Sequence, residues 1–65
     1  MITVNGEPRE GFDGVLLSEF LERAGYETGR IAVEINGEII SKKRWEEVLV
    51  KAGDHIEVVS FVGGG

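Results

Sequence analysis

The sequence contains no cysteine, and its seven lysine and arginine residues are outnumbered by twelve aspartate and glutamate residues. Without cysteine there is no disulfide scaffold, no cysteine-ligated zinc or iron–sulfur site and no thiol nucleophile. Such a composition fits a reducing cytoplasm. The net charge of −5 disfavours nucleic-acid binding, because neutralising phosphates requires a basic face.

Long apolar runs are also missing. No apolar stretch approaches the length of a membrane span, and the first residues lack the basic run and apolar core of a signal peptide. We therefore expect a cytoplasmic protein that does not insert into membranes.

A chain of 65 residues forms one small domain, too small for both a core and a deep substrate cleft. This size favours a carrier or binding module over an enzyme, and we expect no catalytic residues.

Alternation of apolar and polar residues predicts two of five short strands, and hairpin turns and β-branched residues predict the other three. Two pairs of these strands are joined by Asn-Gly, the strongest short signal for a hairpin, because both residues tolerate positive φ. Pro8 places the second strand at a sheet edge, and the last strand is rich in β-branched residues. The predicted strands and turns are Ile2 to Val4, Asn5-Gly6, Glu7 to Phe12, Ile31 to Ile35, Asn36-Gly37, Glu38 to Ile40 and Ile56 to Val62.

One amphipathic helix is predicted between the second and third strands. Asp13 is expected to cap the free N–H groups at its start, and Gly25 is expected to end it in the left-handed conformation. The apolar stripe must be buried against one face of a mixed sheet, which predicts an α+β roll. The residues of this stripe are Leu17, Phe20, Leu21 and Ala24.

Three smaller features have structural interpretations. Ser41 is expected to cap a short helical turn that contains Trp45, whose indole N–H needs a partner at the edge of the core. The basic cluster Lys42-Lys43-Arg44 is typical of a solvated face. His55 has no second imidazole or thiol to share a metal ion, so we expect no metal site and interpret it as a turn residue.

The last strand leads directly into Gly63, Gly64 and Gly65. At average glycine usage, three glycines at a given end arise by chance in about 3 of 10,000 sequences. A tail without side chains can pass through a narrow channel in another protein and present its terminal carboxylate for activation. A frayed end is the alternative interpretation. The predicted organisation is a folded domain over residues 1–62 and a flexible tail over 63–65.

Taken together, these segments resemble the ThiS sulfur carriers of thiamine biosynthesis, a family of the ubiquitin-like β-grasp superfamily. The resemblance covers the whole chain and implies a β-grasp roll, with a mixed sheet of four to five strands on one main helix. One departure is Gly14-Val15 at the helix start, where many relatives place a threonine. The residues that carry the resemblance are Ile2 to Glu7, the helix ending at Gly25, Ile31 to Ile40, Trp45, Gly53 to Glu57 and Phe61 to Gly65.

The resemblance also implies a reaction at Gly65 that partner enzymes carry out. A ThiF-like adenylyltransferase would use ATP and Mg²⁺ to adenylate the Gly65 carboxylate. A cysteine desulfurase or another sulfur donor would then convert it to a thiocarboxylate. A ThiG-like thiazole synthase would receive the sulfur for thiazole formation. The chain itself would bind no cofactor and catalyse nothing.

A docking surface for a partner is predicted beside the tail. If Ile56, Val58 and Val62 face the helix, Val59 and Phe61 face outward as a small apolar patch, which often marks a partner site. We therefore assign docking to Val59, Phe61 and Val62. The alternative is that the sheet edge or the helical turn covers these side chains.

Other functions remain open at this stage. Within the superfamily, a MoaD-like sulfur carrier for another pathway has the same glycine end. A ubiquitin-like modifier would instead join Gly65 to a lysine through an isopeptide bond. A non-covalent β-grasp binding module would not need the tail.

Overall fold

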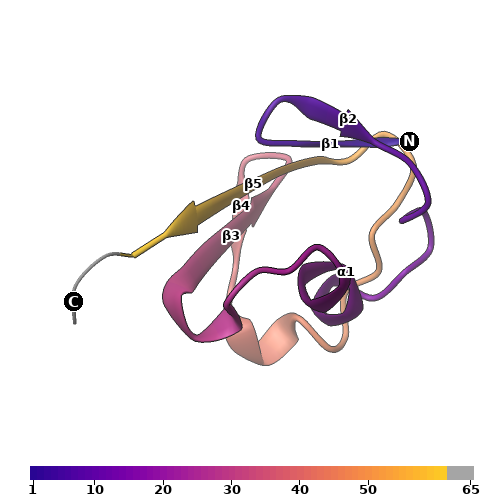
Figure 1. The fold of residues 1–65 in the computed structure, drawn as a ribbon. Helices are drawn as coiled ribbons and strands as arrows, with labels where there is room; N and C mark the ends of the chain where they lie inside the picture. Colours follow the sequence, from indigo (N-terminus) through magenta and orange to yellow (C-terminus); the bar gives the residue numbers. More distant parts are fainter. Residues whose placement is uncertain (62–65) are drawn as a thin grey trace.

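The computed structural model describes residues 1–61, and it shows a five-stranded sheet that covers one helix (Figure 1). The strands are arranged in the order β2-β1-β5-β3-β4. Strand β5 runs parallel to β1 and antiparallel to β3, so the last strand of the chain is the central strand of a mixed sheet. The predicted α+β roll is confirmed. The elements are β1 (Ile2–Val4), β2 (Glu7–Arg9), α1 (Leu17–Arg23), η1 (Thr28–Arg30), β3 (Ile31–Ile35), β4 (Glu38–Ile40), η2 (Lys42–Arg44) and β5 (His55–Ser60).

Both predicted hairpins form. Asn5 and Asn36 each have a φ of 51°, and the glycine after each asparagine also has positive φ. Two successive residues with positive φ match the right-handed twist of the flanking strands. Strand β2 lies at the sheet edge, as Pro8 predicts, but it ends at Arg9 and does not reach Phe12. The chain turns at Gly11 with a φ of 89°, and Phe12 packs edge-on against Phe20 with ring centroids 4.8 Å apart.

The helix buries three of the four residues predicted for its apolar stripe. Leu17, Phe20 and Leu21 are almost fully buried, whereas Ala24 is exposed, so that part of the prediction is wrong. The helix ends at Arg23, because Gly25 adopts positive φ and turns the chain. The N–H of Gly25 donates to Glu22 O and the N–H of Tyr26 donates to Leu21 O, the two bonds of a Schellman ending. Half-buried Tyr26, which follows Gly25, packs against the core.

The start of the helix also differs from the prediction. Helix α1 begins at Leu17, and no side chain caps it. Its first N–H groups donate to carbonyls of a distant loop, Leu17 N to Val48 O at 2.8 Å and Ser18 N to Trp45 O at 2.9 Å. Backbone carbonyl oxygens from residues 45–48 therefore accept from the N–H groups that Asp13 was expected to cap.

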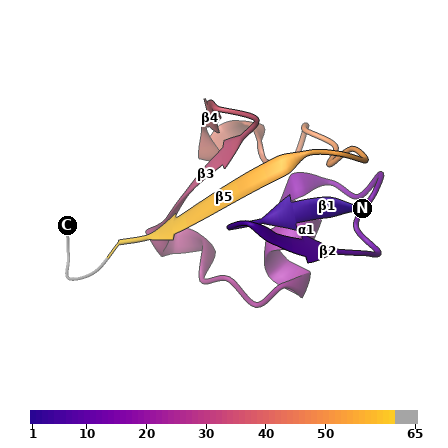
Figure 2. The ribbon, with the colours of Figure 1, turned by 90° about the horizontal axis from the view of Figure 1, so that it is seen from above.

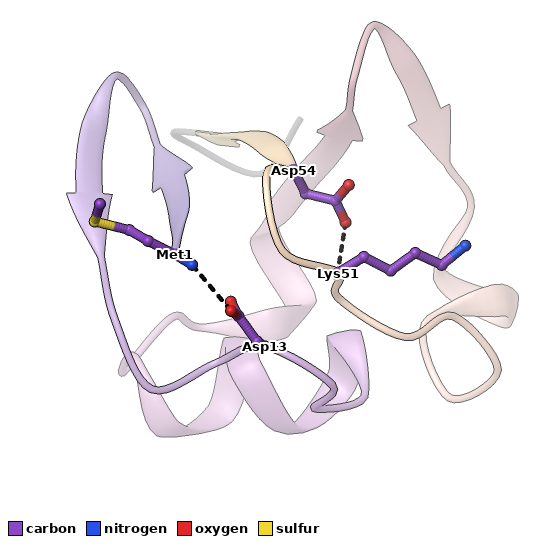
Figure 3. Close-up of polar contacts among 4 residues, drawn as sticks. All are labelled: Met1, Asp13, Lys51 and Asp54. Carbon is purple, nitrogen blue, oxygen red and sulfur yellow. Dashed lines mark hydrogen bonds and ion pairs between the residues drawn. The ribbon is translucent and has the colours of Figure 1, made fainter.

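Asp13 has a different partner, the N-terminal ammonium group of Met1 at 2.9 Å (Figure 3). It does not cap the helix because Gly14 turns the chain with a φ of 83° and the chain then pairs with the loop. Gly14 N donates to Val50 O at 2.7 Å, and Val50 N donates to Val15 O at 2.8 Å. Two residues, Gly14 and Val15, therefore lie between Asp13 and the N-cap residue Leu16.

The loop after β4 is anchored by Trp45. Its side chain is buried, and its indole N–H donates to Ile40 O at 3.0 Å. The prediction that this N–H has a hydrogen-bond partner is confirmed. Ser41 occupies the position before η2 but makes no capping bond with its side chain, so that prediction is wrong. The three-residue turn instead uses the Ser41 carbonyl, which accepts from Arg44 N.

We predict that Phe20→Ala strongly destabilises the protein, whereas Phe61→Ala does not. Phe20 is 1% exposed at the centre of the core, and its truncation should lower the free energy of unfolding by about 3–5 kcal/mol. Phe61 is 55% exposed, and the same truncation should change it by less than about 0.5 kcal/mol. Urea unfolding of both variants measures the difference, and similar losses of stability would contradict this assignment of the core.

Candidate functional site

The strand that leads to the glycines is held between both halves of the sheet. Figure 2 shows β5 crossing the middle of the sheet and continuing past the end of the β1-β2 hairpin. On one side β1 pairs with it up to Ile56, and on the other side β3 pairs with it up to Ser60. Phe61 N then donates to Arg30 O at 2.7 Å, so β3's side supports the chain to the last described residue.

Both hairpin turns bind β5 through their asparagine side chains. Asn5 Oδ1 accepts from Val58 N at 2.8 Å, and Asn5 Nδ2 donates to Val58 O at 3.3 Å. Asn36 Oδ1 accepts from His55 N at 2.9 Å, while Asn36 N donates to His55 O at 2.8 Å. The asparagines therefore shape the turns and also extend the hydrogen-bonded ladder along β5.

A buried carboxylate fixes the entry to the same strand. Asp54 is 9% exposed, and its Oδ2 accepts from the backbone N–H of Lys51 at 2.8 Å (Figure 3). Its Oδ1 accepts from Asn36 Nδ2 at 3.0 Å, so both carboxylate oxygens have donors. The next residue, His55, begins β5 and places Nδ1 2.7 Å from Thr3 Oγ1. It therefore belongs to the strand, and its interpretation as a turn residue is wrong.

The two faces of β5 differ as the sequence predicts. Ile56 and Val58 are buried against the core, whereas Val59 is 59% exposed and Phe61 is 55% exposed. Of the side chains assigned to docking, Val59 and Phe61 are therefore accessible, and the alternative that the sheet edge or η2 covers these two is wrong. Their docking role stays a prediction. Val62 and the tail residues Gly63, Gly64 and Gly65 lie outside the described residues.

The sequence interpretation missed part of this exposed face. Ile39 on β4 is 73% exposed and, together with Val59, lines a hollow of about 250 Å³. Ala32, Glu34 and Glu57 contribute the rest of its outward side chains. The alternation in β4 carried the signal, because a buried Ile40 places Ile39 on the opposite face.

The basic residues and the metal prediction concern other parts of the surface. Lys42, Lys43 and Arg44 are exposed, and Arg44 pairs with Glu38 at 3.5 Å. Across residues 1–61, no three histidine, aspartate or glutamate side chains are grouped so that they could hold a metal ion. None of the helices in this part of the chain has the length and hydropathy that crossing a bilayer requires.

A mixed sheet that packs on one helix, with the C-terminal strand at its centre, defines a small β-grasp domain. The chain belongs to the ThiS family, whose family model matches residues 2–65. A crystal structure of the thiamine biosynthesis protein ThiS from Geobacter metallireducens superposes with a TM-score of 0.80 at 31% identity, covering 98% of this chain and 97% of that one.

Sequence relatives include proteins of two very different lengths. The sulfur carrier protein ThiS of Thermus thermophilus is 37% identical over 65 residues, with both chains fully covered. The thiazole synthase of Paramagnetospirillum magneticum is 36% identical over 64 residues, which are 98% of this chain and 20% of that protein. The chain therefore spans about a fifth of the length of the thiazole synthases that it matches.

We predict that Asn5→Gly weakens the attachment of β5 to the β1-β2 hairpin and preserves the hairpin turn. Glycine adopts positive φ readily, so the loss is confined to the two bonds with Val58. The free energy of unfolding should fall by about 1–2 kcal/mol, and the Val58 amide should exchange hydrogen faster relative to the amides of β3.

Asn36→Gly is the matched control for this prediction. It should expose the His55 amide and leave the Val58 amide protected, because Asn36 bonds to His55 and Asp54 at the entry to β5 and not to Val58. Equal effects of both variants on both amides would contradict two separate clamps.

Proposed function

We propose that this protein is a sulfur carrier of thiamine biosynthesis whose Gly65 carboxylate is converted to a thiocarboxylate. The match to the ThiS family through residue 65 carries the proposal, because it includes the three glycines. Relatives of the same length, from Thermus thermophilus and Bacillus subtilis, are named sulfur carrier protein ThiS. In this role the protein is a co-substrate of other enzymes and catalyses no step itself.

The chemistry begins with activation, since a free carboxylate is a poor acyl donor. A carboxylate oxygen of Gly65 attacks the α-phosphorus of ATP, and the bond to the β-phosphate breaks to release pyrophosphate. Mg²⁺ bound with ATP in the activating enzyme offsets the phosphate charge. The product is an acyl-adenylate in which AMP is the leaving group.

Sulfur then replaces AMP at the same carbonyl carbon. The terminal sulfur of a cysteine desulfurase persulfide attacks the carbonyl, and AMP leaves with the bonding electron pair. A second thiol attacks the donor's sulfur and breaks the sulfur–sulfur bond, which leaves the thiocarboxylate and forms a disulfide. No side chain of this protein is needed, which agrees with its lack of cysteine.

The partners follow from these steps. A ThiF-like adenylyltransferase supplies ATP chemistry, and a ThiG-like thiazole synthase accepts the sulfur. Support for the second partner comes from the thiazole synthases, in which a segment similar to this chain forms part of a longer protein. Docking is assigned to Val59, Phe61 and Val62, next to the tail.

We predict that deleting Gly65 abolishes activation by the adenylyltransferase without changing stability. The deletion moves the carboxylate back by one residue, so it no longer reaches the ATP site. Exchange of labelled pyrophosphate into ATP measures the adenylation step directly. Full exchange with the shortened protein would contradict a reaction at Gly65.

We also predict that Phe61→Asp weakens activation while the domain stays folded. A carboxylate in place of an exposed apolar ring makes docking unfavourable, and KM for the carrier should rise about tenfold or more. The same exchange assay, with thermal unfolding as the folding control, tests this. Unchanged kinetics in a folded variant would remove Phe61 from the docking surface.

A further inference from the structure

The outward side of β3, β4 and β5 forms a mixed surface that we call the outer sheet face. Ala32, Ile39 and Val59 line a hollow of about 250 Å³ on this face, together with the carboxylates of Glu34 and Glu57. Ile39, Val59 and Phe61 are each more than half exposed. The residues of the outer sheet face are Ala32, Glu34, Ile39, Glu57, Val59 and Phe61.

The two carboxylates of this face oppose each other across neighbouring strands. Glu34 on β3 is directly opposite Glu57 on β5, in the same register that pairs Ala32 with Val59. Side chains opposite each other in an antiparallel pair have Cβ atoms about 5 Å apart, and like charges there are unfavourable. Neither glutamate takes part in any of the ion pairs found in residues 1–61. The pair is therefore uncompensated in the free protein.

Docking of a partner would raise the free energy of this carboxylate pair unless the partner supplies a positive charge. A protein that covers Ile39, Val59 and Phe61 removes water from the neighbouring glutamates. Desolvating two unpaired carboxylates opposes binding much more strongly than their repulsion does in water. A partner that uses this apolar face must therefore bring a positive charge to its centre.

Resting on the proposed function, we infer that the adenylating enzyme places a cationic side chain between Glu34 and Glu57 when it docks on the outer sheet face. An arginine fits best, because its planar guanidinium can donate to two carboxylates at once. The apolar residues of the outer sheet face supply the buried area, and the two glutamates set the orientation of the docked enzyme. They also exclude partners whose apolar patch lacks a central cation.

The test is the double variant Glu34→Gln with Glu57→Gln, assayed with the adenylyltransferase by pyrophosphate exchange. We expect KM for the carrier to rise about tenfold with little change in kcat, because docking is weakened and the tail is intact. The dependence of KM on salt should become shallower. The melting temperature should rise by roughly 2–5 °C, since the repulsion across the strands is gone.

The matched control is Glu46→Gln with Glu47→Gln, which changes net charge equally at exposed positions in the loop after η2. It should leave KM within about twofold, since these carboxylates lie outside the outer sheet face. An equal rise in KM in both double variants would reduce the effect to overall charge and overturn the inference.

The remaining outcomes separate the inference from the proposed function. If the wild-type protein supports exchange and the Glu34 and Glu57 variant has unchanged KM and salt dependence, the inferred cation is absent. If the melting temperature of this variant rises while KM is unchanged, the glutamate pair destabilises the fold and has no role in docking. If the wild-type protein is not adenylated at all, the proposed function fails, and the inference fails with it.

Discussion

The hydrogen bonds that hold β5 in the centre of the sheet are the constraint on which the rest of the structure depends. Strand β1 pairs with only two residues of β5, and the Asn5 side chain extends that ladder to Val58. Asn36 performs the same task at His55, where Asp54 also fixes the start of the strand. Both hairpins form hydrogen bonds to β5. These bonds fix the position of the strand even though the core of the domain is small.

This arrangement separates two tasks within one strand. The inward side chains Ile56 and Val58 complete the core against helix α1. Outward side chains of the same strand, such as Val59, are exposed, so we expect substitutions there to leave the core intact. The proposed carrier function requires this separation, because partners would bind the domain while the reaction takes place at Gly65.

The sequence was enough to predict the features that depend on local chemistry. Asn-Gly pairs set both hairpins, alternation gave the buried faces of β3 and β5, and Gly25 marked the helix end. The start of the helix was not predictable, because its N–H groups bond to carbonyls of Trp45 and Val48, far along the chain.

Features of the candidate site divide in the same way. The exposure of Val59 and Phe61 follows from alternation within one strand. The opposition of Glu34 and Glu57 depends on the register between two strands, which no local pattern of either strand specifies. The part of the outer sheet face that depends on strand register therefore emerged only from the structure.

The central claim is that the carboxylate of Gly65 carries sulfur. Peptide-resolved mass spectrometry tests it most directly, on protein incubated with the adenylyltransferase, ATP, Mg²⁺ and a persulfide donor. The account predicts exchange of one oxygen for sulfur, confined to the C-terminal peptide and absent without ATP. Mapping to that peptide separates the exchange from oxidation of Met1, which adds nearly the same mass. An unchanged C-terminal peptide with an activator that is competent on another carrier would contradict the account.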